Sequence, residues 1–115
     1  MHETSLIRYT LDAVEAQAIR MRLHHVRSIR IVVGDMRGAV PELMQYGFQI
    51  LCQNRPLFSG AVLEIETREI QLECKQCGRR FHVDDFHAVE CPDCGSGGYH
   101  LVKGNELYID SFEGE

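Results

Sequence analysis

The sequence predicts an α+β fold, in which two helices lie on a small three-stranded sheet and a segment with four cysteines is inserted between two of the strands. Apolar residues recur every three or four positions over residues 5–23 and 41–54, the period of a helix with one buried face. They alternate with polar residues over 26–33, 62–66 and 107–110, as in half-buried strands. Because strand patterns stand on both sides of the cysteines, we interpret the cysteine segment as an insertion.

The first predicted helix covers residues 5–23, and Thr4 or Ser5 is expected as its N-cap. We expect His24 and His25 to close it, since a cationic or dipolar group complements the carboxyl end of a helix. One apolar stripe along this helix is formed by Ile7, Leu11, Val14, Ala18 and Met21.

The second predicted helix begins at Pro41, where a fixed φ suits the first helical position, and ends near Asn54, ahead of Pro56. Its buried stripe is expected to contain Met44, Phe48 and Leu51. The inward residues of the three strands are expected to be Ile29, Ile31 and Val33 in the first, Leu63 and Ile65 in the second, and Leu107 and Ile109 in the last.

Two Cys-x-x-Cys-Gly turns, Cys74-Lys75-Gln76-Cys77-Gly78 and Cys91-Pro92-Asp93-Cys94-Gly95, carry the strongest chemical signal in the chain. Each spacing directs two sulfurs to one point, and the following glycine permits the positive φ that such a turn needs. Two such turns face to face present four thiolates at about 2.3 Å from one ion, a closed structural zinc site. Disulfides or a dithiol redox pair are the alternatives. The chain opens Met-His-Glu without an apolar leader, which disfavours a secreted disulfide protein.

This pattern divides the chain into an α/β domain, residues 1–69 plus 104–115, and a zinc ribbon, residues 70–103, with short strands expected near 81–83 and 100–102. Twelve Lys and Arg against seventeen Asp and Glu give a net charge of −5, which disfavours nucleic acid as a partner. No apolar run is long enough for a membrane span, so we expect no membrane insertion. Free thiols indicate a reducing, cytoplasmic location, and Cys52 is expected to be a small buried hydrophobe.

The amino terminus is the second feature with chemical content. His2 places a terminal amine, a backbone amide and an imidazole within reach of one ion, and the carboxylate of Glu3 follows. Square-planar nitrogen donors suit nickel and copper and do not suit zinc. A frayed, solvated terminus without function is the alternative. His82, His87 and His100 are expected at the surface, since four cysteines already fill a zinc site. That closed site and the lack of a nucleophile pattern argue against an enzyme.

The chain resembles the HypA/HybF family of nickel metallochaperones along essentially its whole length. The matching stretches are Met-His-Glu-Thr-Ser at the start, Ile29 to Gly34, Pro41-Glu42-Leu43 with Tyr46-Gly47-Phe48, Gly60 to Ile65, both cysteine turns, and Gly104-Asn105-Glu106-Leu107. Many relatives carry a carboxylate where this chain has Val40, so an extra acidic ligand from that loop is in doubt, although Glu42 or Asp35 could approach.

This resemblance implies a nickel-binding domain, 1–69 plus 104–115, with nickel at Met1, His2 and Glu3 and zinc at Cys74, Cys77, Cys91 and Cys94. It further implies delivery of nickel to the large subunit precursor of nickel–iron hydrogenase, with a HypB-type GTPase as a partner. Some members of the family also support the maturation of urease. A homodimer is compatible with the resemblance. A zinc-ribbon adaptor or a nucleic-acid-binding module without nickel is the rival interpretation.

Overall fold

The computed structural model describes residues 3–115, which form two compact units. The first contains the chain up to Val32 together with Gly38–Glu66 and Tyr108–Glu115. The second contains Val33–Arg37 and Thr67–Leu107. The predicted assignment of residues 1–69 plus 104–115 to nickel and of 70–103 to zinc remains a prediction about what these parts bind.

Helix α1 spans Glu3–Arg20 and therefore begins and ends earlier than the sequence pattern suggested. Thr4 and Ser5 lie inside the helix, so the predicted N-cap is wrong. Met21 lies beyond the last turn and is 59% exposed, so its predicted place in the buried stripe is also wrong. The residues that α1 buries are Leu6, Ile7, Thr10, Leu11, Val14 and Ala18.

A backbone turn, and not the two histidines, closes α1. Leu23 N–H donates to Ala18 O at 2.9 Å and Arg22 N–H donates to Ile19 O at 3.1 Å, while Arg22 has a φ of 59°. These two bonds and the left-handed residue form a Schellman motif, which satisfies carbonyls at the end of a helix. His24 and His25 instead donate their backbone N–H groups to Glu115 O, at 2.7 and 2.9 Å. The predicted helix-closing role of the histidines is therefore wrong.

Helix α2 spans Pro41–Cys52 and starts at the proline that the sequence indicated. It ends two residues before Asn54, with Gln53 as the C-cap. Met44 and Phe48 are buried as expected, and Leu51 is half-buried. Two 3-10 turns, η1 over Asp35–Arg37 and η2 over Pro56–Phe58, stand before and after this helix.

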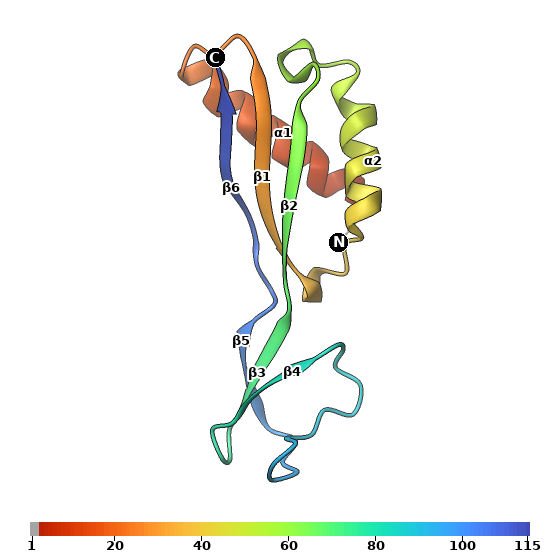
Figure 1. Cartoon of the computed structure of the whole chain (residues 1–115), viewed down its shortest axis with the longest axis vertical. Helices are drawn as coiled ribbons and strands as arrows, with labels where there is room; N and C mark the ends of the chain where they lie inside the picture. The colour runs from red at the N-terminus through yellow and green to blue at the C-terminus, as the bar shows by residue number, and fades with distance from the viewer. Residues whose placement is uncertain (1–2) are drawn as a thin grey trace. The chain divides into compact units, whose positions relative to one another are not determined.

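The main sheet has the order β2-β1-β6 and uses the three strands that the alternating patterns predicted. Its strands are β1 at Val26–Gly34, β2 at Val62–Arg68 and β6 at Leu107–Gly114. Strands β1 and β2 run in the same direction and are joined through α2, and both helices cover one face of the sheet (Figure 1). Glu115 and His25 exchange backbone hydrogen bonds of 2.9 Å, which makes β6 antiparallel to β1.

The core of the first unit lies between the helices and the sheet. The carboxyl half of β1 departs from the alternation predicted for a half-buried strand, because Ile31, Val32 and Val33 are all buried. In β6, Leu107 and Ile109 are half-buried, and in β2 Leu63 is buried while Ile65 is half-buried. A strand buried on both faces reads as a continuous apolar run, and Ile31-Val32-Val33 is such a run.

The second unit contains its own sheet of order β4-β3-β5. Strand β3 covers Ile70–Cys74, β4 covers Arg80–Val83 and β5 covers Tyr99–Lys103. The sequence predicted β4 and β5 but missed the central strand β3, which pairs antiparallel with both neighbours. In β3, Ile70, Leu72 and Cys74 alternate with polar residues and are all buried. Cys74, the first candidate metal ligand, therefore lies on the central strand of this sheet.

Gly34 and Gly104 are required by a close backbone contact within the second unit. A Cβ on Gly34 would lie 2.0 Å from Gly104 O, and Gly104 has a φ of 120°. Met36 N–H donates to Gly104 O at 2.8 Å and Gly34 N–H donates to Glu106 O at 2.8 Å. No other residue type leaves room for this approach, so Gly34 and Gly104 are packing requirements.

Candidate metal centres

The two cysteine turns have the same backbone geometry. Gly78 N–H donates to Cys74 O and Gly95 N–H donates to Cys91 O, both at 2.9 Å. The glycines have φ values of 79° and 74°, which confirms the positive φ expected from the sequence. Cys74 N–H then donates to Arg79 O at 2.8 Å, and Cys91 N–H donates to Ser96 O at 2.9 Å. Each turn is therefore a closed loop that points its two sulfurs the same way.

The four cysteines form a single cluster. The ligand atoms of Cys74, Cys77, Cys91 and Cys94 all lie within 4.8 Å of one another. Sγ of Cys74 is 3.5 Å from Sγ of Cys94, and Sγ of Cys77 is 3.5 Å from Sγ of Cys91. Sulfurs about 2.3 Å from a tetrahedral ion are separated by about 3.8 Å. The thiol spacing and the all-sulfur chemistry of this donor set therefore fit zinc.

The cysteines of each turn differ in their affinity for a proton. The backbone N–H of Cys77 lowers the pKa of the Cys74 thiol to about 6, and the N–H of Cys94 lowers the pKa of Cys91. The N–H of Arg79 favours a thiolate at Cys77, but the hydrogen bond with Cys91 and burial outweigh it and raise the pKa of Cys77 to about 12. The first thiol of each turn therefore loses its proton more readily than an ordinary cysteine. A bound cation is needed to ionise all four thiols.

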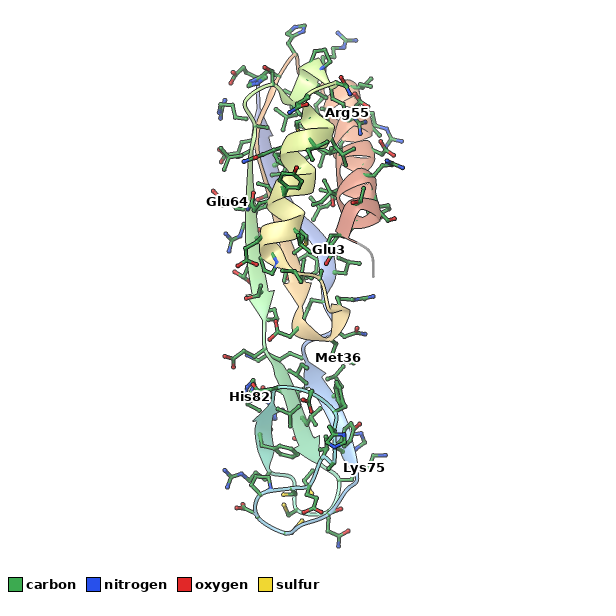
Figure 2. All side chains as sticks on the ribbon, turned by 90° about the vertical axis from the view of Figure 1, so that its right-hand side faces the viewer. Glu3, Met36, Arg55, Glu64, Lys75 and His82 are labelled. Carbon is green, nitrogen blue, oxygen red and sulfur yellow. The ribbon has the colours of Figure 1, made fainter. Side chains whose placement is uncertain are left out.

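The two arginines next to the cluster, Arg79 and Arg80, have carboxylate neighbours. Arg79 Nη1 lies 2.7 Å from Asp93 Oδ1, an ion pair that joins the two cysteine turns, and Arg80 Nε lies 3.3 Å from Glu73 Oε1. All three histidines of the segment are exposed, as expected. Paired arginines leave little positive potential for phosphates. Figure 2 shows sulfur atoms gathered beside Lys75 in this unit.

Of the predicted amino-terminal ligands, Met1 and His2 lie outside the described residues, and Glu3 occupies the first turn of α1. Glu3 Oε1 accepts a hydrogen bond of 3.3 Å from the backbone N–H of Val40, the N-cap residue of α2. Figure 2 shows Glu3 between the start of α1 and the start of α2. A carboxylate is favoured at a helix amino terminus by the helix dipole, so the fold holds Glu3 at a defined place.

Glu3 also lines a shallow groove on the first unit, which the sequence did not predict. Its volume is about 300 Å³. We call it the Glu3 groove, and its lining residues are Glu3, Thr4, Leu43, Tyr46, Gly47, Ile50 and Leu51. One signal was present in the sequence, because Leu43, Tyr46 and Ile50 are apolar at helical spacing on the face of α2 opposite Met44 and Phe48.

The other cysteine, Cys52, is half-buried at the end of α2 and belongs to neither metal centre. Burial raises the pKa of its thiol, and the nearby Arg55 opposes this effect. A raised pKa leaves less of the reactive thiolate at neutral pH.

No helix among residues 3–115 is long and apolar enough to cross a membrane.

Comparison of the chain with known proteins identifies one family. A family model described as "Hydrogenase/urease nickel incorporation, metallochaperone" matches residues 1–114. Hydrogenase maturation factor HypA of Moorella thermoacetica is 36% identical over 115 residues, covering 100% of both chains. The protein of the same name from Alkalilimnicola ehrlichii is 40% identical over 114 residues, covering 98% of each. A solution structure of the nickel metallochaperone HypA from Helicobacter pylori, 23% identical, matches the fold with a TM-score of 0.66 over 99% of this chain and 97% of its own.

Proposed function

This chain belongs to the HypA family of hydrogenase/urease nickel-incorporation metallochaperones, with nickel as its cargo, and from that premise we propose which of its residues hold each metal. Nickel binds at Met1, His2 and Glu3, through the terminal amine, the amide and imidazole of His2, and the carboxylate of Glu3. A planar set of nitrogens suits divalent nickel. The observation that carries this assignment is the fixed position of Glu3 against the Val40 N–H.

Zinc binds at Cys74, Cys77, Cys91 and Cys94 and has a structural role. The support is the clustering of four sulfurs within 4.8 Å. Four thiolates around one ion leave no open position for water, so this centre supplies no catalysis. A metallochaperone carries its metal without converting a substrate, so we assign the protein no enzymatic activity. Zinc also keeps the thiolates away from nickel, because soft sulfur ligands would otherwise compete for the cargo.

Delivery of nickel requires partners that accept it. We assign these as a HypB-type GTPase and the large subunit precursor of nickel–iron hydrogenase, with urease maturation as an extension of the same role. The location is cytoplasmic, where thiols stay reduced. The ion pairs of Arg79 and Arg80 support a function without nucleic acid.

Nickel titration of the untagged, zinc-loaded protein tests the amino-terminal site. Three variants are compared with the parent: His2→Ala, an extension by Gly-Ser ahead of Met1, and His24→Ala as a control. His24 is exposed and lies beyond the end of α1. We expect His2→Ala and the extension to lose at least tenfold in nickel affinity, and His24→Ala to match the parent.

Loss of affinity on extension would identify the amine as a ligand, because the extension leaves the His2 side chain intact. Binding should also weaken as the pH falls below about 6.5, since nickel binds only the neutral imidazole. Equal nickel loading by the parent and by His2→Ala would refute the assignment and leave a zinc-stapled adaptor.

A further inference from the structure

The four-cysteine cluster presents its sulfurs unequally to solvent. Cys74 and Cys91, the first cysteine of each turn, are only 2% and 3% exposed. Cys77 and Cys94, the second cysteine of each turn, are exposed. A zinc site holds its cysteines as thiolates, and the thiolate is the form of cysteine that reacts with electrophiles. A reagent that arrives from solvent therefore meets Cys77 and Cys94 before it meets the other two.

Each exposed sulfur is in contact with a buried sulfur of the other turn. Sγ of Cys77 lies 3.5 Å from Sγ of Cys91, and Sγ of Cys94 lies 3.5 Å from Sγ of Cys74. Sulfurs this close need little movement to form a disulfide bond. An accessible thiolate beside a second cysteine is the arrangement in which peroxides oxidise cysteine reversibly.

Two contacts besides the cluster connect the first turn with the second turn and the segment that follows it. Arg79 Nη1 lies 2.7 Å from Asp93 Oδ1. Lys75 N–H donates a hydrogen bond of 3.1 Å to Gly98 O. Neither contact involves a sulfur, so oxidation of one cysteine leaves both contacts in place. The buried cysteine of the opposite turn then lies next to the oxidised one.

We propose that Cys77 and Cys94 are peroxide-reactive sites, and that each forms a disulfide with the buried cysteine of the other turn. We call the bonds of Cys77 to Cys91 and of Cys94 to Cys74 cross-turn disulfides. This inference rests on the proposed function, because it takes the four cysteines as the zinc ligands.

The reaction has two steps, described here for Cys77. Its thiolate attacks the peroxide, so that an S–O bond forms, the O–O bond breaks and hydroxide leaves. The thiolate of Cys91 then attacks the sulfur of Cys77, so that the S–S bond forms, the S–O bond breaks and a second hydroxide leaves. The two sulfurs together lose two electrons, and the peroxide gains them.

A cross-turn disulfide affects the second unit differently from a disulfide within one turn. Either kind of bond removes two of the four zinc ligands, so the affinity for the ion is lost. The cross-turn bond also keeps the two turns covalently connected, whereas bonds within the turns would leave them joined only by the chain between them. A thiol reductant breaks the bond and restores the four ligands.

Treatment of the zinc-loaded full chain with hydrogen peroxide tests the proposal. A chromogenic chelator measures released zinc, and mass spectrometry of alkylated, unreduced peptides locates the disulfides. Trypsin cleaves after Lys75 and an Asp-specific protease cleaves before Asp93, so the two cysteines of each turn fall on different peptides. Cys52→Ala is the control, because it removes the cysteine outside the cluster. Limiting iodoacetamide, in a separate reaction, ranks the four cysteines by accessibility.

We expect cross-turn disulfides to exceed within-turn disulfides at least tenfold, in the parent and in Cys52→Ala alike. Below one equivalent of peroxide, about one zinc ion should be released for each peroxide consumed. The second cysteine of each turn should take up iodoacetamide at least tenfold faster than the first.

Within-turn disulfides as the main product, zinc retained under excess peroxide, or faster labelling of Cys74 or Cys91 would overturn the inference. Loss of the cross-turn products in Cys52→Ala would overturn it as well. Failure of the proposed function is distinct, since it would appear as protein that binds no zinc before any peroxide is added.

Discussion

At the scale of single residues, His82 is a side chain whose protonated form the fold favours. Its Nε2 lies 2.9 Å from Asp84 Oδ1, and its Nδ1 lies 3.2 Å from Ile70 O and 3.7 Å from Glu69 Oε2. The hydrogen bond with Asp84 raises the pKa of His82 most, with Glu69 acting in the same direction and partial burial opposing both. The protonated form is the one that these oxygens stabilise.

This raised pKa predicts a pH dependence. A histidine whose pKa is higher in the folded state stabilises the fold fully below its unfolded pKa of about 6.5 and loses that contribution as the pH rises through the folded value. We expect an NMR titration to place the pKa of His82 above 6.5 in the parent and lower in Asp84→Asn. Asp85→Asn is the matched control, because Asp85 Oδ1 accepts from His87 N–H instead. Equal His82 pKa values in the parent and in Asp84→Asn would contradict the assignment.

The environment of Glu3 could be predicted only in part from the sequence. Its position after His2 indicated a donor next to a nitrogen set. Its partner, the Val40 N–H, lies 37 positions away and is a backbone group, and a backbone donor leaves no mark in a sequence. Relatives' carboxylates at the position of Val40 suggested a lost ligand, whereas here that position contributes its amide to Glu3.

At the scale of elements, the end of α1 was misplaced because the apolar period continues past the helix. Met21 falls on the stripe but follows the last helical residue, Arg20. Arg22, with a φ of 59°, reverses the chain there. Neither glycine nor asparagine marks the position, and these are the usual signals for such an end. No residue near this position therefore indicated that the helix would end there.

Arg22→Gly should stabilise the protein. Glycine adopts a positive φ without the steric cost that arginine meets, so we expect the free energy of unfolding to rise by roughly 0.5–1 kcal/mol. Urea unfolding of the zinc-loaded protein measures the change. Arg20→Gly provides the comparison, since Arg20 is helical and its replacement should destabilise by about the same amount. A lower urea midpoint for Arg22→Gly would show that the arginine side chain makes a contact worth more than the strain.

At the scale of the whole molecule, the two units differ in what stabilises them. The first unit has a core between two helices and a sheet, including Leu11, Ile29 and Phe48. Buried apolar residues of the second unit are few: Val33, Ile70, Leu72, Cys74 and Cys91. A unit that buries so few apolar side chains requires another source of free energy to stabilise its folded state. Zinc on four thiolates supplies roughly 10–16 kcal/mol at neutral pH.

Removal of zinc should therefore unfold one unit and spare the other. In Cys91→Ala we expect amides of β3, β4 and β5 to lose protection from hydrogen exchange, while those of α1 and α2 keep it. Cys52→Ala is the control, since Cys52 lies outside the four-cysteine cluster and should leave both patterns intact. Hydrogen exchange with mass spectrometry resolves the two units. Retained protection in β3 of Cys91→Ala would show that the sheet stands without the metal.

The sequence by itself determined the α+β class, the three strands of the main sheet, the start of α2 and the four cysteines of one cluster. These follow from local rules, namely the period of apolar residues, the fixed φ of Pro41 and the spacing of thiols with Gly78 and Gly95. Only the tertiary structure decided the end of α1, the central place of β3, the bond from Val40 to Glu3 and the groove beside Gly47. Each of these depends on groups distant in sequence or on backbone atoms common to all residues, whose partners are fixed when the chain packs.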